Sequence, residues 1–367
     1  MTMPIRLSQP ERSVPERAPF QLGSKIPKLA FLRAISAAIV VFFHSGYTAI
    51  PAGFGVLTFF VISGFLITHL LLKENEISDT ISIRNFYARR ALRILPAFYV
   101  YWILAVVSLT NPFHRMQIVW PEAISSLLYV ANYYHGLHGH PSTLFSHTWS
   151  LGVEEQFYVL WPCVFVFFRR RLRVFATTLL FVIPAMWAYR ACLYFAHVSE
   201  AYIYTSFETR FDAILVGCWF AIAIHTGFAN RVIQEMRKSR YLPLTITLLA
   251  ASIWANDLWG REYRDLGSFT VDPLLVATLI LQLITLKGGA WMDGRIFSYL
   301  GKISYSTYLY QQLVLPVVHR VMPNSPHLLY SSIGLLCVWA VASASFEIVE
   351  KPFLRLKKKY SARSSAP

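Results

Sequence analysis

Charged residues are scarce in this 367-residue chain: Asp, Glu, Lys and Arg together make up 14% of it, whereas hydrophobic residues make up 55%. A soluble domain of this length needs about twice that share of charge to cover its surface. The scarcity therefore excludes an ordinary soluble globular protein. The aromatic share of 16% is high, and Tyr and Trp suit the boundary between hydrocarbon and water. The composition predicts an integral membrane protein whose partner is the lipid bilayer.

Acidic residues are few, with 19 Asp and Glu against 34 Lys and Arg, and the formal net charge is +15. Such an excess can indicate binding of nucleic acid. Here, however, the basic residues form short clusters between long apolar runs, where positive charge sets membrane orientation. No nucleic-acid partner is predicted.

Cysteine is also rare, and the chain contains no CxxC pair and no Cys/His spacing typical of a metal site. The four cysteines all lie inside apolar runs: Cys163, Cys192, Cys218 and Cys337. They are expected to be small buried apolar residues rather than disulfide partners. No metal site is predicted.

Long apolar runs dominate what remains, and a bilayer-spanning helix needs about 20 such residues. Ten runs qualify: 29–50, 54–72, 95–110, 150–168, 174–195, 210–226, 241–258, 271–287, 303–320 and 328–347. They predict an all-α fold, a polytopic membrane bundle of about ten transmembrane helices. An even number places both termini on the same side.

Positive charge supports this arrangement, because 27 of the 34 Lys and Arg residues lie on the side that holds the termini. By the positive-inside rule that side is the cytoplasm. We expect three regions: a disordered cytoplasmic tail over 1–28, the membrane domain over 29–355 and a basic cytoplasmic tail over 356–367. The weakly apolar stretch 118–134, on the outer side, is expected to rest on the membrane surface.

Two ionisable residues lie in the first span, where a charge costs about 2.5–3.5 kcal/mol on insertion scales. Arg33 and His44 are eleven residues apart, which is about three helical turns, so they share a face about 16 Å apart. His44 would lie past the middle of the bilayer, towards the outside. One interpretation is functional; the other is a histidine satisfied by a carbonyl and an arginine reaching the inner interface.

Two adjacent carboxylates, Glu154 and Glu155, lie in the motif HTWSLGVEEQFY. Adjacent helical residues point about 100° apart, so we expect at most one of them to face His44. A carboxylate beside an imidazole fixes its tautomer and stabilises its charged form.

A basic helix follows the second span in the motif NFYARRALRILP. Arg89 and Arg93 are i, i+4 neighbours with Arg90 beside them. They either set topology or clamp phosphate oxygens, which guanidinium groups suit. Two further pairs, Arg210 with Asp212 and Glu350 with Lys351, are expected to be structural ion pairs.

Taken together, the chain resembles the acyltransferase-3 family of polytopic membrane O-acyltransferases from about Leu29 to Arg355. The motifs that carry the resemblance are, in order, FLRAISAAIVVFFH, GFGVLTFFVISGFLIT, IRNFYARRALRILPAFY, HTWSLGVEEQFYVLWP, RFDAILVG, LGKISYSTYLY and IVEKPFLRL. Three features depart from the family pattern: Leu57 stands where an acidic residue is common, Gln311 stands where a histidine is common, and LAFLRA stands in place of LDGLRA.

The resemblance implies an acyl-CoA donor, acetyl-CoA above all, taken from the cytoplasm, and a carbohydrate acceptor outside a bacterial inner membrane. Its Arg and His motif falls on Arg33 and His44, its membrane glutamate on Glu154, and its basic motif on Arg89, Arg90 and Arg93. It implies that His44 takes the acceptor proton, Glu154 orients or balances His44, and the basic motif binds CoA.

Several alternatives stay open. Arg33 either polarises the thioester carbonyl or holds the CoA arm, and a covalent acyl-histidine is a further route. A second function is a transporter or flippase for a lipid-linked glycan that uses Arg33, His44 and Glu154 as a proton relay. A non-catalytic scaffold is a third. The sequence names neither the glycan nor the oligomeric state.

Overall fold

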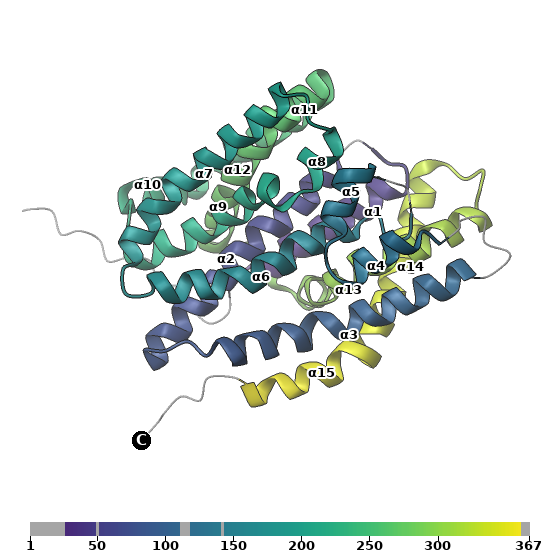
Figure 1. Ribbon diagram of the computed structural model, residues 1–367, viewed down its shortest axis with the longest axis horizontal. Helices are drawn as coiled ribbons and strands as arrows, with labels where there is room; N and C mark the ends of the chain where they lie inside the picture. Colours follow the sequence, from purple (N-terminus) through teal and green to yellow (C-terminus); the bar gives the residue numbers. More distant parts are fainter. Residues whose placement is uncertain (1–25, 49–50, 111–117, 141–142, 361–367) are drawn as a thin grey trace, which may run out of the picture.

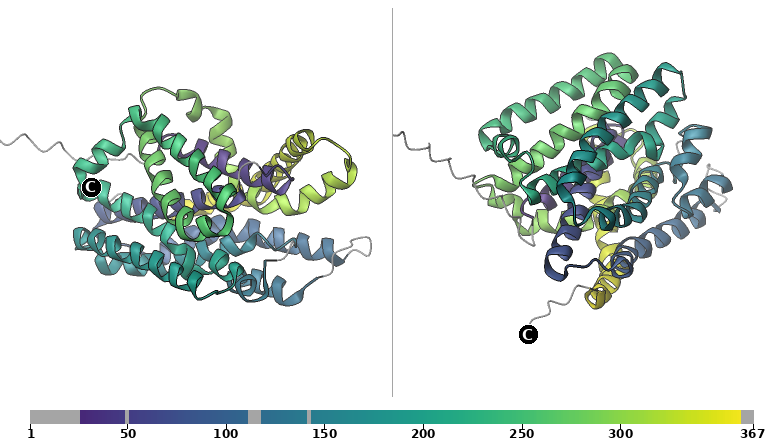
Figure 2. Two further views of the ribbon diagram at one scale, coloured as in Figure 1. Left: turned by 90° about the horizontal axis from the view of Figure 1, so that it is seen from above. Right: turned by 60° about the vertical axis from the view of Figure 1, so that its left-hand side comes forward.

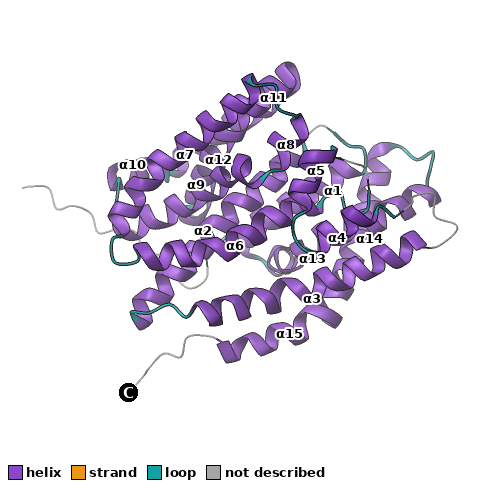
Figure 3. Ribbon diagram, in the orientation of Figure 1, coloured by secondary structure: helices purple, strands orange, loops and turns teal. Residues whose placement is uncertain are grey.

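The computed structural model describes residues 26–48, 51–110, 118–140 and 143–360, and every regular element in these ranges is helical (Figure 3). The α-helices are α1 (Leu29–His44), α2 (Ala52–Ser78), α3 (Ile83–Thr110), α4 (Trp120–Leu127), α5 (Ala131–His138), α6 (Thr148–Phe168), α7 (Leu172–Phe195), α8 (Glu200–Thr205), α9 (Phe207–Thr226), α10 (Asn230–Met236), α11 (Leu242–Tyr263), α12 (Phe269–Thr285), α13 (Arg295–Val321), α14 (His327–Ser345) and α15 (Lys351–Leu356). Short 3-10 or π turns are η1 (Ser239–Tyr241), η2 (Arg264–Ser268), η3 (Ala290–Asp293), η4 (Phe346–Glu350) and η5 (Lys357–Tyr360).

Each of the ten predicted ranges falls on one helix, in order α1, α2, α3, α6, α7, α9, α11, α12, α13 and α14. The all-α prediction is confirmed. The stretch predicted to rest on the membrane surface forms α4 and the start of α5. Of the predicted tails, residues 1–25 and 361–367 lie outside the described residues.

The number of spans is smaller than predicted. By length and composition, six helical stretches of the described chain are fit to cross a membrane, or seven if α8–α9 and α10, bent by 113°, count as one. Two of the ten helices are not among these seven stretches. The helix α1 has only 16 residues, and α13 is less apolar than the stretches that qualify. The stretch Ser239–Thr285 counts once although it holds both α11 and α12, which pack against each other after a non-helical residue at Gly260.

Large apolar side chains cover the outside of the bundle. Phe167 on α6 is 82% exposed and Phe181 on α7 is 73% exposed, and Val107 and Trp254 are exposed on α3 and α11. Exposing such a surface to water is unfavourable in free energy, whereas exposing it to lipid tails is not. The protein is a multi-pass membrane protein.

The helix α2 lies at the centre of the bundle, packed against α1, α6, α9 and α12 (Figure 1). On one flank α15 runs beside α3, and α13 joins α1 to α14 (Figure 2). The short helices α4, α5 and α8 form one cluster, in which α5 packs against both α4 and α8. His44, the last residue of α1, lines one cavity together with residues of α8.

The pair Ser63–Gly64 lies at a close approach of two helices. A Cβ atom added at Gly64 would lie 1.9 Å from the carbonyl oxygen of Ile214 on α9. Gly217 is its counterpart, because a Cβ atom there would lie 2.1 Å from the carbonyl oxygen of Val61. Small residues let two membrane helices touch backbone to backbone, which drives their association where the hydrophobic effect is absent.

The predicted ion pairs Arg210–Asp212 and Glu350–Lys351 are both wrong, because these residues have other partners. Asp212 pairs with Arg190 at 2.7 Å, because α7 packs against α9 and brings that guanidinium to it. Arg210 instead stacks on Phe269. At the other end of the chain Glu350 accepts a hydrogen bond from Ser306, and Lys351 pairs with Glu347 one turn earlier.

Candidate active site

Two cavities meet inside the bundle. The larger, the histidine cavity, has a volume of about 680 Å³ and is lined by residues of α1, α2, α8, α11 and η2, among others. The smaller, the arginine cavity, has a volume of about 80 Å³ and is lined mainly by α1, α2, α3, α6 and α13. Val56 and Tyr308 line both cavities, so these two side chains form the partition between them.

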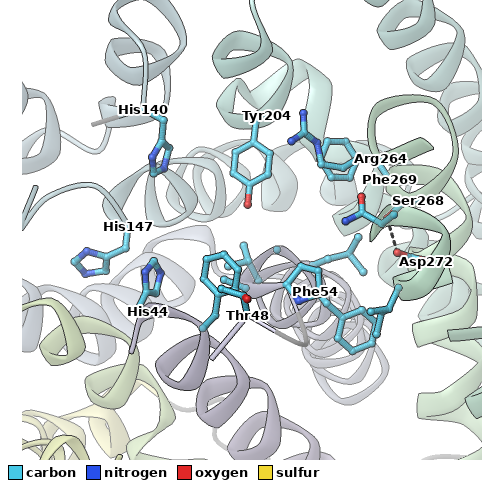
Figure 4. A pocket seen from close by; sticks show the side chains of 18 of the residues that line it. His44, Thr48, Phe54, His140, His147, Tyr204, Arg264, Ser268, Phe269 and Asp272 are labelled. Carbon is cyan, nitrogen blue, oxygen red and sulfur yellow. Dashed lines mark hydrogen bonds between the residues drawn. The ribbon is translucent and has the colours of Figure 1, made fainter. Parts of the chain in front are cut away.

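His44 is the last residue of α1 and lines the histidine cavity together with His140 and His147 (Figure 4). The Nδ1 atom of His44 lies 3.4 Å from the side-chain nitrogen of Gln312. The three imidazoles come from three different segments and occupy the same end of the cavity (Figure 4). This end is the natural position for a proton-accepting group.

Two of these histidines were missed by the sequence reasoning. His147 begins the HTWS motif, and its ring packs at 5.3 Å against the rings of Tyr101 and Tyr308. His140 follows α5, and burial and the neighbouring His135 lower its pKa to about 4. His140 is therefore neutral at neutral pH. The position of His147 at the start of the HTWS motif could have indicated a functional residue, whereas His140 belongs to no motif in the sequence.

The arginine cavity collects Arg33, Arg90 and Arg93. Arg33 donates from Nε and Nη2 to the hydroxyl of Ser304, at 3.2 and 3.1 Å. Arg90 lies over the ring of Tyr158 at 5.6 Å. Three guanidinium groups around so small a cavity favour an anionic or strongly polar ligand.

Arg89 does not line this cavity. Its guanidinium pairs with Glu74 at 2.5 Å and donates to the backbone carbonyl of Tyr360 at 2.7 Å. It therefore ties the start of α3 to the end of α2 and to η5. Of the three predicted basic residues, Arg90 and Arg93 line the cavity. Arg89 instead links α2, α3 and η5 beside it.

Glu154 also lines the arginine cavity, together with Glu155, and it accepts a hydrogen bond from Ser63 at 2.7 Å. The structure does not bring it to His44, which lines the other cavity. The reason is the distance along α6: Glu154 lies six residues, or about 9 Å, beyond the start of that helix at Thr148. The carboxylate shares the arginine cavity with Arg33 and Arg90, and no ion pair joins it to either of them among the described residues.

Lys357 is a further basic residue near the arginine cavity, and it was assigned to a tail in the sequence analysis. It lies in η5, which packs against α3. Burial and the positive charges of Arg90, Arg93 and Arg89 lower its pKa to about 8. A lowered pKa in a cluster of cations means that a bound anion would relieve their repulsion.

Two of the three departures from the family pattern are buried in the bundle. Leu57 is buried and lines the histidine cavity. Gln311 is fully buried, and neither its amide oxygen nor its amide nitrogen has a hydrogen-bond partner among the described residues. In the described ranges, no group of three or more His, Cys, Asp or Glu side chains could hold a metal ion.

The sequence profile of the acyltransferase domain matches residues 26–346, and the chain belongs to the acyltransferase-3 family. It is 28% identical over 352 residues to the peptidoglycan O-acetyltransferase OatA of Listeria monocytogenes, covering 89% of this chain and 55% of that protein. It is 27% identical over 365 residues to the O-acetyltransferase OatA of Staphylococcus aureus, covering 93% of this chain and 59% of that protein. The chain thus spans little more than half the length of these relatives. No solved structure matches it.

Proposed function

We propose that this protein is a membrane O-acyltransferase that moves an acetyl group from cytoplasmic acetyl-CoA to a carbohydrate hydroxyl on the outer side of a bacterial inner membrane. The observation that carries the proposal is the meeting of two chemically different cavities at Val56 and Tyr308. One offers cations for a phosphorylated donor, and the other offers imidazoles to accept a proton. The membership of the family and the names of its relatives favour the same reaction.

The donor would enter at the arginine cavity. The phosphates of CoA would bind Arg90 and Arg93 at the rim, where Lys357 lies close by. The acyl arm would then run past Arg33 towards Tyr308. Arg89 is a positioning residue here, since it fixes η5 against α3.

The acceptor would enter at the histidine cavity. His44 removes the proton from the attacking hydroxyl as its oxygen forms a bond with the thioester carbonyl carbon. The carbon–sulfur bond breaks, and the proton passes from His44 to the CoA thiolate. The products are an O-acetyl ester and free CoA. Tyr308 lies at the crossing point, held by hydrogen bonds with Ser150 and the backbone carbonyl of His147.

The proposal includes orientation. With the Lys- and Arg-rich loops in the cytoplasm, both termini and the arginine cavity face inwards. The histidine cavity then opens outwards beneath α8. The relative from Listeria monocytogenes is named for peptidoglycan, so that polymer is one acceptor to assay beside exopolysaccharide, lipopolysaccharide and lipochitooligosaccharide.

Donor kinetics test the proposal. With labelled acetyl-CoA and purified protein, Arg93→Ala and Lys357→Ala should each raise the KM for acetyl-CoA about tenfold, because a charge-assisted hydrogen bond contributes about 1.5–3 kcal/mol. If the arginine and the lysine bind the phosphates equally in ground and transition state, kcat should change little.

The matched control is Lys359→Ala, which removes the same charge from an exposed position two residues further along η5. It should leave the KM for acetyl-CoA within about twofold of the wild type, as expected for an exposed charge. Equal effects of Lys357→Ala and Lys359→Ala would contradict a specific phosphate contact. An unchanged KM in Arg93→Ala would leave that arginine as a determinant of topology only.

A further inference from the structure

One side chain with an exchangeable proton lies in the partition between the two cavities. Val56 and Tyr308 are the two described residues that line both cavities, and a valine side chain has no proton that it can exchange. The phenol group of Tyr308 can both donate and accept a hydrogen bond. Within the described ranges, Tyr308 is therefore the one side chain that can pass a proton directly from one cavity to the other.

The hydroxyl of Tyr308 is paired with a second hydroxyl on the side of the arginine cavity. Its oxygen lies 2.5 Å from Oγ of Ser150, a residue of α6 that lines the arginine cavity. Both hydroxyls are in reach of the backbone carbonyl of His147, at 2.8 Å from Tyr308 and 3.1 Å from Ser150. While one hydroxyl donates to this carbonyl, the other can donate to its neighbour. The pair therefore has two arrangements, and it can accept a proton at one end and release one at the other.

Each end of the hydroxyl pair faces groups of the proposed reaction. On α6, Ser150 and Glu154 are i, i+4 neighbours that line the arginine cavity, where the donor would bind. In the histidine cavity, His44 lies beside His147, whose ring packs at 5.3 Å on the ring of Tyr308 (Figure 4). At about 680 Å³ this cavity has room for water molecules of about 30 Å³ each. A proton can therefore pass from His44 through water to Tyr308, and from Ser150 to the donor.

Apolar side chains surround the hydroxyl pair. Phe59 and Phe60 line the arginine cavity beside Val56, and the ring of Phe59 lies 6.4 Å from the ring of Tyr308. Phe60 is buried and packs on Trp149 at 6.1 Å. Closely packed apolar side chains leave few voids that a water molecule can enter. A proton that crosses the partition would therefore use the two hydroxyls rather than a column of water.

The proposed reaction needs such a path because its substrates meet from opposite sides. As the acceptor oxygen bonds to the thioester carbon and the carbon–sulfur bond breaks, a proton is left on His44 and a negative charge on the sulfur. A thiol with a pKa of about 8.5 is protonated at neutral pH, so the sulfur must gain a proton. If it gained one from the cytoplasm while His44 released its own outside, each turnover would move one positive charge outwards. That movement would oppose a membrane potential that is negative inside.

We infer that Tyr308 and Ser150 form a proton relay that returns the acceptor's proton from His44 to the sulfur of CoA, so that acetyl transfer moves no net charge across the membrane. The proton on His44 passes through water to the oxygen of Tyr308. The proton of Tyr308 moves to Oγ of Ser150, and the proton of Ser150 moves to the sulfur. Each hydroxyl gains one proton and loses one. This inference rests on the proposed function for its reaction and adds the path of the proton.

Counting protons on both faces tests the relay. Purified full-length protein is placed in sealed vesicles of known orientation, with a pH-sensitive dye in weak buffer on each side. Acetyl-CoA is supplied on the face of the arginine cavity and a tetramer of N-acetylglucosamine on the face of the histidine cavity. The wild type should form O-acetyl groups without a change of pH on either face, because the proton of the acceptor ends on the CoA thiol.

Two variants interrupt the relay from different helices. Tyr308→Phe keeps the ring and removes the hydroxyl, and it should lower kcat at least about tenfold. Its remaining turnover should release one proton on the sugar face for each O-acetyl group. Ser150→Ala should change the proton balance in the same way, so the test stands even if the Tyr308 variant fails to fold. An unchanged proton balance in the variants would overturn the relay.

Tyr310→Phe is the matched control. Tyr310 is a buried tyrosine of the same helix, its hydroxyl accepts a hydrogen bond from Ser345 at 3.1 Å, and it lines neither cavity. This variant should keep the kcat of the wild type and leave the pH of both faces unchanged. A proton balance altered as much by Tyr310→Phe as by Tyr308→Phe would contradict a specific path through Tyr308.

The same vesicles separate the relay from the proposed function. O-acetyl product formed from opposite faces, with one proton released on the sugar face and one taken up on the CoA face, would leave the proposed reaction standing and overturn the relay. Product formed only when both substrates are on one face would contradict the proposed function, and the relay with it.

Discussion

His44→Ala should abolish acetyl transfer, with a fall in kcat of about 100-fold to 10,000-fold, the range that a general base contributes. The imidazole lies at the same end of the histidine cavity as His147, whose ring packs against Tyr308 (Figure 4). No carboxylate of the described residues bonds to His44, so its loss would not leave a buried charge unpaired. The measurement is turnover per mole of membrane-extracted protein, with the amount of protein determined for each variant.

A matched control is His138→Ala, which removes an imidazole from an exposed position on α5 that does not line the cavity. It should retain nearly full activity. Substantial turnover in His44→Ala would reject the general-base role. Loss of His44→Ala protein from the membrane, with His138→Ala protein retained, would mean that His44 serves the fold instead.

Gly64→Val and Gly217→Val should each prevent stable folding, because the new side chains would enter the backbone of the neighbouring helix. Distances of 1.9 and 2.1 Å from a Cβ atom to a carbonyl oxygen cannot be tolerated without separating α2 from α9. Overpacking usually costs about 1–3 kcal/mol, and a backbone clash at the centre of the bundle should exceed that range.

The measurement is thermal unfolding in detergent, together with the yield of protein from the membrane. Val107→Leu is the control, since it enlarges a side chain on the exposed face of α3 without a clash. It should unfold like the wild type. Unchanged unfolding temperatures in both glycine variants would contradict the close approach of α2 and α9.

Much of the fold could be predicted from the sequence because apolar runs determine where helices form in a membrane. Each of the ten predicted ranges overlaps a helix, although 29–50 runs beyond the end of α1 at His44 and its last two residues lie outside the described ones. The number of helices that cross the membrane was harder to predict. By length and composition, α1 is too short and α13 is too polar to be counted as a span. Small residues such as Ser63–Gly64 permit either a close helix approach or a kink, and which of these occurs depends on the helix that packs there; here it is α9 with Gly217.

Pairing of side chains is where the sequence reasoning failed, because pairing depends on packing between distant segments. The distance of Glu154 along α6 removes it from His44, and α7 supplies Arg190 as the partner of Asp212. Lys357 joins the arginines only because the chain folds back along α3. His140 likewise reaches the cavity through the packing of short helices that have no motif.

Sidedness of the two substrates tests the central claim most directly. Purified protein is placed in sealed vesicles of known orientation, with acetyl-CoA and a membrane-impermeant tetramer of N-acetylglucosamine supplied on chosen faces. We expect acetyl transfer only when acetyl-CoA is on the face that carries the arginine cavity and the sugar is on the face that carries the histidine cavity. Transfer that requires both substrates on the same face would contradict a reaction across the partition of Val56 and Tyr308.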